Sequence, residues 1–271
     1  MTSRARHENS AMLLEVPVVD AVLAIAVAMS AVIKVDKVTY TDAAGATLEG
    51  LVAYDDAAKG KRPAVVVIHD WMGITDHTEQ RAVELARMGY VAFAADLYGQ
   101  GVRPADQQAA GTLAGKLKGN RALMRTRARA ALDAVSTRAD VDTSKLAAIG
   151  FCFGGTAAIE LAKSGAPLKG VVSFHGGLDA PVAGESKNIK GKVLVLHGAA
   201  DPFVPPKDIE AFTKDLNDAK IDWTMTSYAG AVHAFTVPAA GNDPKKGAAY
   251  NDTVSKRAFI AMKAFFDEIF G

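Results

Sequence analysis

The sequence predicts an α/β fold in which helices cover both faces of a mainly parallel central sheet. Short, almost wholly apolar runs such as residues 64–69 are typical of strands that are buried on both faces. These runs alternate with amphipathic stretches of helical period, which is the pattern of parallel strands joined by helices. A length of 271 residues suits one large domain of this kind.

The elements follow one another in a simple order. Strands at residues 33–40 and 47–54 are expected to form a hairpin, because Ala44-Gly45 lies between them. The strands expected after the hairpin cover residues 64–69, 90–95, 146–151, 170–175, 192–197 and 221–228. The expected helices cover residues 76–88, 105–117, 120–139, 157–165, 207–219 and 253–269. The polar residues 140–143 predict a turn before the strand that ends at Phe151.

We separate residues 1–32, as a leader, from residues 33–271, as the folded domain. Residues 21–32 are almost purely apolar, but they are too few for a membrane span of about 20 residues. The small residues of Ala28-Met29-Ser30 are typical of a signal-peptide cleavage site, whereas Glu15 and Asp20 are atypical of a signal peptide. Two interpretations stay open: a signal that exports the protein to the periplasm, or a loosely packed extension of a cytoplasmic protein.

The composition argues against several classes of protein. Lys and Arg number 31 against 30 Asp and Glu, so the basic excess expected of a nucleic-acid surface is missing. The single cysteine, Cys152, excludes an intramolecular disulfide and a multi-cysteine zinc site. A redox sensor is also disfavoured, because the chain has no second cysteine to resolve an oxidised thiol.

Cys152 stands between glycines at the end of an apolar run and directly before a helix-forming run. The sequence Gly150-Phe151-Cys152-Phe153-Gly154 has the layout of a nucleophile elbow, written G-x-C-x-G in place of G-x-S-x-G. A Cβ at Gly150 or Gly154 would collide in the sharp turn between strand and helix. The turn would place the sulfur at a helix N-terminus, where free N–H groups can stabilise a thiolate and bind an oxyanion.

Two further residues complete a predicted catalytic triad. Cys152, Asp201 and His233 occur in the order nucleophile, acid, histidine, which is the order of α/β-hydrolases. Each follows a predicted strand, at the sheet edge where active sites of such folds lie. His233 would accept the thiol proton, Asp201 would orient the imidazole, and the thiolate would attack a carbonyl carbon.

Each triad residue also has a structural interpretation without catalysis. A lone cysteine is often a small apolar filler, Asp201-Pro202 can be a turn, and His233 can be a surface histidine. The glycines around Cys152 and the ordered partners favour the catalytic interpretation. The other histidines compete less well, because none has the C-terminal position that the order requires, although His175 can line the pocket.

The motifs resemble those of the dienelactone hydrolase family. The resemblance covers residues 33–270 and rests on five segments. These are the elbow Gly150-Phe151-Cys152-Phe153-Gly154-Gly155, His197-Gly198-Ala199-Ala200-Asp201-Pro202-Phe203-Val204-Pro205, Gly230-Ala231-Val232-His233-Ala234-Phe235, Val67-Ile68-His69-Asp70-Trp71-Met72-Gly73 and Ala95-Asp96-Leu97-Tyr98. It implies one α/β-hydrolase domain, an ester- or lactone-hydrolysing enzyme, and neither a metal nor an organic cofactor. It also implies an oxyanion hole formed by the backbone N–H groups of Trp71 and Phe153.

The sequence departs from the family pattern at two places. The family has a glutamate that binds the resting thiol, and the matching residue here is Asp70, whose side chain is one methylene shorter. The family also has two arginines that bind a substrate carboxylate. Val237 stands at one of these positions, and residues 105–115 contain no arginine for the other, although Arg103 is near. We therefore expect a neutral ester, lactone or thioester as the substrate. The alternative is a non-catalytic small-molecule binding protein on the same fold.

Overall fold

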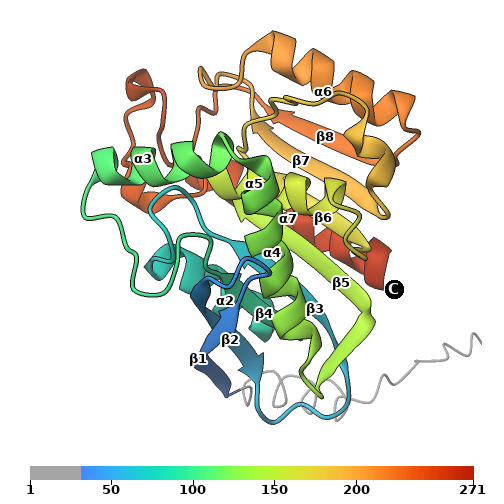
Figure 1. Ribbon diagram of the computed structural model, residues 1–271. Coiled ribbons are helices and arrows are strands. Elements are labelled where there is room, and N and C mark those ends of the chain that lie inside the picture. Colours follow the sequence, from blue (N-terminus) through green and yellow to red (C-terminus); the bar gives the residue numbers. More distant parts are fainter. Residues whose placement is uncertain (1–31) are drawn as a thin grey trace, which may run out of the picture.

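The computed structural model describes residues 32–271, so the leader, apart from Val32, lies outside the described residues. One eight-stranded sheet has the strand order β1-β2-β4-β3-β5-β6-β7-β8, and helices lie on both of its faces (Figure 1). The predicted α/β fold with a mainly parallel sheet is confirmed.

The sheet is antiparallel at one edge and parallel elsewhere. The hairpin strands β1 (Ile33–Thr41) and β2 (Thr47–Asp55) pair antiparallel, and β2 pairs antiparallel with β4 (Val91–Ala95). The other pairs are parallel and involve β3 (Arg62–Ile68), β5 (Val141–Phe151), β6 (Gly170–Phe174), β7 (Lys192–Gly198) and β8 (Trp223–Tyr228). Parallel strands place their carboxyl ends at the same edge of the sheet, which is where loops of an active site can meet.

Helices divide between the two faces of the sheet. One face packs against α3 (Gln107–Lys118), α4 (Arg121–Ser136), α5 (Phe153–Lys163) and α6 (Pro206–Asp218). The other face packs against α2 (Asp76–Arg87) and α7 (Asp252–Phe270). Short 3-10 helices cover η1 (Glu185–Asn188), η2 (Pro238–Ala240) and η3 (Pro244–Lys246).

The apolar run of β3 shows why the sheet needs cover on both sides. Val66 and Ile68 belong to the core on the face of α4, whereas Val65 and Val67 belong to the core on the face of α2 and α7. All four side chains are fully buried. Because strand side chains alternate between the two faces, a continuous apolar run is stable only in a sheet that is covered on both faces. Each such side chain contributes about 1.5–3 kcal/mol on burial.

The turn predicted at residues 140–143 is wrong. Strand β5 already begins at Val141, which pairs with Arg62 of β3 before the register shifts. The Arg62 guanidinium lies 2.7 Å from the Asp140 carboxylate, and the Arg62 N–H donates to the Asp140 carbonyl at 2.9 Å. Tertiary pairing therefore extends the strand through residues whose polar side chains predicted a turn.

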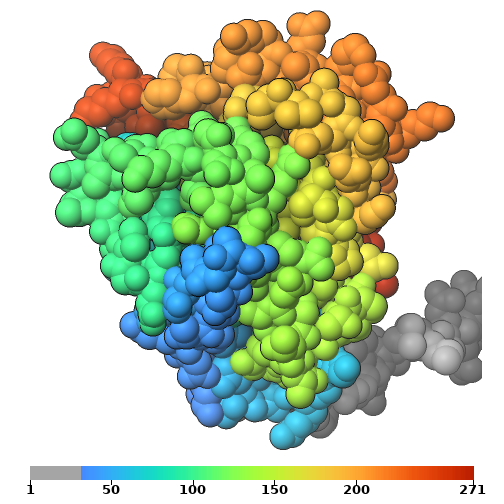
Figure 2. All heavy atoms as spheres, in the orientation of Figure 1, coloured from blue at the N-terminus to red at the C-terminus, as the bar shows by residue number. Residues whose placement is uncertain are grey.

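The strand order places the hairpin strand β1 at one edge of the sheet and β8 at the other. In the space-filling view the hairpin (blue) lies in the lower half of the molecule and α6 (orange) lies at the top (Figure 2). Between the two edge strands lie the strands that carry the candidate active site. Within residues 32–271 no helix is long and apolar enough to cross a lipid bilayer.

Candidate active site

The predicted site residues lie directly after strands of the parallel part of the sheet. Asp70 follows β3, Cys152 follows β5, Asp201 follows β7 and His233 follows β8. The strand order places β3, β5, β6, β7 and β8 side by side, so these loops share one edge of the sheet. Residues up to 163 positions apart in the chain are therefore close enough to act together.

The turn at Cys152 has the geometry of a nucleophile elbow. Cys152 has φ 56° and ψ −119°, and α5 begins at the next residue. A Cβ on Gly150 would lie 1.9 Å from the Gly154 carbonyl oxygen, and one on Gly154 would lie 2.3 Å from the His69 carbonyl oxygen. The glycines are thus required by close approach of strand, turn and helix, as the sequence predicted. The thiol remains partly exposed.

Asp201 and His233 are joined by a short hydrogen bond. The Nδ1 atom of His233 lies 2.8 Å from Oδ2 of Asp201, and the Asp201 carboxylate is fully buried. The second carboxylate oxygen accepts the Phe203 N–H at 2.9 Å, which fixes the plane of the carboxylate. The backbone of His233 is held in turn by the Gly247 carbonyl at 3.1 Å and the Ala249 N–H at 3.0 Å.

The electrostatic surroundings of His233 favour its charged form. Burial lowers the pKa of His233, but its interactions with Asp201 and Cys152 outweigh burial and raise that pKa to about 10. The pKa values of the other described histidines are lowered by burial, and these are His69, His77, His175 and His197. Among the histidines of residues 32–271, His233 is thus the one that can be cationic at neutral pH beside a thiol.

Asp70 is buried at the same edge of the sheet. Its Oδ1 atom accepts the Met72 N–H at 2.8 Å, so the carboxylate caps its own loop. Burial raises the pKa of Asp70, and the nearby His69 and His233 act in the opposite direction. Within the structure of residues 32–271, the Asp70 carboxylate makes no hydrogen bond to Cys152.

The two backbone N–H groups predicted to form an oxyanion hole are free of acceptors in the described part of the chain. The N–H groups of Trp71 and Phe153 donate to no acceptor among residues 32–271. Phe153 is the first residue of α5, where N–H groups have no partner within the helix. Free N–H groups near a nucleophile can bind a developing oxyanion.

The loop that carries Trp71 is held by the loop after β4. The Tyr98 hydroxyl donates to the Trp71 carbonyl at 2.8 Å. The His69 ring joins both loops, because its Nε2 accepts the Leu97 N–H at 3.2 Å and its Nδ1 donates to the Asp70 carbonyl at 2.5 Å. Its low pKa is consistent with this neutral tautomer.

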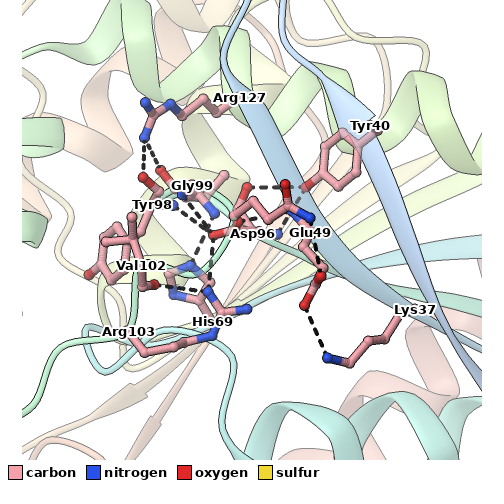
Figure 3. Close-up of polar contacts among 12 residues, drawn as sticks. Lys37, Tyr40, Glu49, His69, Asp96, Tyr98, Gly99, Val102, Arg103 and Arg127 are labelled. Carbon is pink, nitrogen blue, oxygen red and sulfur yellow. Dashed lines mark hydrogen bonds and ion pairs between the residues drawn. The ribbon is translucent and has the colours of Figure 1, made fainter.

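The Asp96 carboxylate holds the loop after β4 in place by hydrogen bonds to its backbone (Figure 3). Its carboxylate accepts the N–H groups of Tyr98 at 2.9 Å, of Gly99 at 3.1 Å and of Glu49 at 3.1 Å. Arg127 of α4 donates to the carbonyls of Leu97 and Tyr98. In the sequence, Asp96 and Tyr98 are recognisable only as part of a motif, because their partners lie in distant elements.

The structure also places aromatic groups that were not predicted as site residues. The Phe203 ring packs edge-on against the His233 ring at a centroid distance of 5.3 Å, yet Phe203 is 60% exposed. Phe235 and Val237, which follow His233 in the same loop, are buried. A large aromatic side chain two residues after Asp201 is a sequence signal that could have indicated Phe203.

Comparison with known proteins assigns the chain to a family. The model of the dienelactone hydrolase family matches residues 48–270. The chain belongs to the dienelactone hydrolase family. A solved structure named m3DLH is 42% identical, has a TM-score of 0.84 and is matched over 88% of this chain and 98% of its own. A dienelactone hydrolase-like promiscuous phosphotriesterase, P91 from metagenomic libraries, is 41% identical with a TM-score of 0.83 over the same shares.

A bacterial relative carries a matching name. A Yersinia pestis protein provisionally named carboxymethylenebutenolidase is 29% identical over 210 residues, which are 70% of this chain and 75% of the relative. This dienelactone hydrolase family member is therefore a hydrolase of the carboxylic ester class, as the sequence predicted. No group of three or more potential metal ligands occurs in the part of the chain that the structure describes.

Proposed function

We propose that this family member hydrolyses a neutral ester or lactone through a Cys152-His233-Asp201 triad, without a cofactor. The observation that carries the proposal is the arrangement of His233, which bonds to buried Asp201 at 2.8 Å and has its pKa raised by Cys152 and Asp201 together. A histidine of raised pKa beside a cysteine at a nucleophile elbow favours a thiolate–imidazolium pair. The domain that performs this reaction is proposed to be residues 33–271.

In the first half of the reaction the thiolate of Cys152 attacks the carbonyl carbon of the substrate. A C–S bond forms, and the carbonyl π electrons move to oxygen. We assign the stabilisation of that oxyanion to the N–H groups of Trp71 and Phe153. When the intermediate collapses, the C–O bond to the leaving group breaks, and His233 donates its proton to the departing oxygen. The product of this half is an acyl-thioester on Cys152.

In the second half water resolves the acyl-thioester. His233, now neutral, accepts a proton from the water as its oxygen attacks the thioester carbonyl. Collapse breaks the C–S bond and releases the carboxylic acid, while Cys152 and His233 regain the thiolate–imidazolium pair. Asp201 keeps the imidazole oriented and stabilises its charge in both halves.

We assign Asp70 a supporting role in the same site. Its carboxylate holds the Met72 N–H and thereby shapes the loop on which the Trp71 N–H is presented. The charge of Asp70 also acts on His233, since the two groups interact electrostatically. The shorter side chain is compatible with this role, because it reaches its own loop and needs no contact with the resting thiol.

The surroundings of the triad support a neutral, apolar substrate. Phe203 presents an exposed ring beside His233, and Val237 stands where the family pattern has an arginine. Arg103 precedes the segment 105–115 by two residues, but its guanidinium donates to the Val102 carbonyl at 2.9 Å and lies 3.9 Å from Asp96. The Arg103 guanidinium is therefore not positioned to make a bidentate hydrogen bond to a substrate carboxylate.

The test is hydrolysis of a short p-nitrophenyl acyl ester together with alkylation of the thiol by iodoacetamide. We expect turnover, rapid labelling of Cys152, and loss of about 10³-fold or more in kcat for Cys152→Ala. A Cys152→Ala protein with full activity would refute the triad. Ligand protection against heat without turnover, with an unreactive thiol, would instead identify a binding protein.

A second candidate substrate is a neutral phosphate triester. It is favoured by the 41% identity to a relative that is named a promiscuous phosphotriesterase. The same thiolate could attack phosphorus, and the same N–H groups could bind the phosphoryl oxygen. Release of p-nitrophenolate from a dialkyl p-nitrophenyl phosphate, compared between the wild type and Cys152→Ala, tests this candidate. No release above the rate of the variant would exclude it.

A further inference from the structure

One buried histidine of the site has no part in the reaction steps above. His175 follows β6, is fully buried, and lies between the nucleophile and the histidine loop. Its ring is 5.2 Å from the His233 ring and 5.0 Å from the Phe235 ring, in an edge-to-face arrangement with both. It therefore forms the wall against which the proposed catalytic imidazole rests.

The hydrogen bonds of His175 determine its tautomer. The Cys152 N–H is shared between two acceptors, the Phe174 carbonyl at 3.0 Å and Nδ1 of the His175 ring at 3.1 Å, so Nδ1 acts as an acceptor and carries no proton. The proton must then lie on Nε2, which donates to the Thr236 hydroxyl at 2.8 Å. The ring thus joins the backbone of the nucleophile to the loop of His233, although Cys152 and Thr236 are 84 positions apart in the chain.

The surroundings keep this ring neutral. Burial lowers the pKa of His175, and the nearby His233 and His77 lower it further. Titratable groups around the ring thus comprise His233 after β8, His77 of α2 and the thiol of Cys152. A ring protonated at Nδ1 could no longer accept the Cys152 N–H, which would keep only the Phe174 carbonyl, so neutrality is a condition of the bridge.

Backbone strain marks the same place. Four non-glycine residues of the described chain have positive φ: Cys152, His175, Lys220 and Ala234. Three of them lie in the loops that meet at the thiol. Glycine would adopt the φ of 41° at position 175 without strain, so a histidine there keeps its side chain at an energetic cost.

We propose that His175 is a positioning residue, whose neutral imidazole links the Cys152 N–H to Thr236 and thereby sets the distance between the thiol and the His233 ring. The inference rests on the proposed function, because it assigns the bridge a purpose in that reaction. A misplacement of about 1 Å between reacting groups can lower a rate about 100-fold, which is the effect that the bridge would prevent.

The test compares three variants that cut the bridge in different places. His175→Phe removes both hydrogen bonds and keeps an aromatic ring, and Thr236→Val removes one partner and keeps its shape. His175→Asn retains an acceptor near the position of Nδ1. We expect His175→Phe and Thr236→Val to lower kcat by about 10- to 100-fold with little change in KM. His175→Asn should recover part of that loss.

The rate of Cys152 alkylation against pH supplies a readout that general destabilisation would not move. In His175→Phe and Thr236→Val the midpoint should shift to higher pH, because the thiolate is then held less well by His233. Val135→Ala, in the core at the far end of α4, serves as a control of reduced thermal stability with wild-type kcat and midpoint.

Two outcomes separate the inference from the proposed function. Wild-type alkylation, pH profile and kcat in both Thr236→Val and His175→Phe would overturn the positioning role, and Thr236→Val suffices if His175→Phe does not fold. A wild-type thiol that is unreactive at neutral pH, or a fully active Cys152→Ala, would overturn the proposed function itself.

Discussion

At the scale of single residues, the charge states of the histidines distinguish one candidate base from its neighbours. Burial acts on all five histidines of residues 32–271 in the same direction, towards the neutral form. His233 differs because a buried carboxylate and a thiol face its two sides. The identity of a histidine as an acid–base group thus depends on its partners and not on its burial.

Asp201→Asn should separate the carboxylate's charge from its shape. The variant should lower kcat by about 10³- to 10⁴-fold, because an amide no longer favours the imidazolium or its correct tautomer. The pKa of His233 should fall well below its value of about 10 in the wild type. NMR titration of the imidazole and ester hydrolysis measure the two effects. Asp218→Asn, at the exposed end of α6, is the control. Equal pKa values of His233 in the two variants would contradict the prediction.

Asp201→Asn should also change how the free energy of unfolding depends on pH. The folded-state pKa of His233 is about 10, above the unfolded value of about 6.5, so its contribution is complete below pH 6.5 and is lost towards pH 10. The difference in unfolding free energy between the wild type and Asp201→Asn should therefore be larger at pH 6 than at pH 10. Urea unfolding of both proteins at pH 6 and pH 10 measures this difference. A difference that is larger at pH 10 than at pH 6 would contradict the prediction.

Phe203→Ala should change which substrates the enzyme prefers. Its exposed ring lies against His233, the residue that we propose to protonate the leaving group of an ester. Removing it should raise KM for a phenyl ester more than for a methyl ester, because only the larger group loses apolar contact, worth about 1–3 kcal/mol. Parallel kinetics on the two esters measure the ratio. An equal change for both would mean that the ring contacts no leaving group.

At the scale of elements, the glycines of the elbow decide whether β5 and α5 can meet. Gly154→Ala should destabilise the protein by about 3 kcal/mol or more, since the new Cβ would lie 2.3 Å from two backbone carbonyl oxygens. Gly115→Ala is the matched control, because it lies exposed in α3 with open space around it, and it should stabilise by about 0.5–1 kcal/mol. Denaturant unfolding measures both, and equal effects would refute the steric explanation.

The elements were predictable where local pattern and tertiary environment agree. The apolar runs of β3 and β4 and the amphipathic α7 lie within a few residues of their predicted bounds. The start of β5 was not predictable, because Val141 is drawn into the sheet by pairing with Arg62, which lies 79 residues earlier in the chain. Asp140 and its neighbours have the polarity of a turn, and nothing adjacent in sequence indicates the ion pair that overrides it.

At the scale of the whole molecule, the buried neutral histidines make stability sensitive to acid. The pKa of His77 is lowered to about 4, and those of His69, His175 and His197 are also lowered. Each binds its proton more readily in the unfolded chain, so stability is present above pH 6.5 and is lost as pH falls towards 4. Asp70, whose pKa is raised, acts in the opposite sense.

His77→Phe should reduce this loss in acid. The His77 ring packs edge-on against Phe151, so phenylalanine can take its place in the core. Between pH 6.5 and pH 4 the wild type should lose about 2–3 kcal/mol more than the variant, which is the linkage of one such histidine. Urea unfolding at pH 7, 5.5 and 4 measures the difference. Parallel stability curves for the two proteins would contradict the assignment.

The sequence by itself determined the class of fold, the elbow around Cys152 and the order in which Asp201 and His233 follow it. These features depend on neighbouring residues, because steric conflict at Gly150 and Gly154 and the alternation of apolar side chains act over a few positions. Family resemblance then added the loops of Asp70 and Trp71.

Only the tertiary structure decided how those loops are joined. The bridge through His175 to Thr236, the support of the Trp71 loop by Tyr98 and the ring of Phe203 beside His233 connect loops that follow different strands. A side chain's partner across the sheet edge depends on strand order and register, which local pattern does not specify. The protonation of each histidine follows from those partners, so it too required the folded chain.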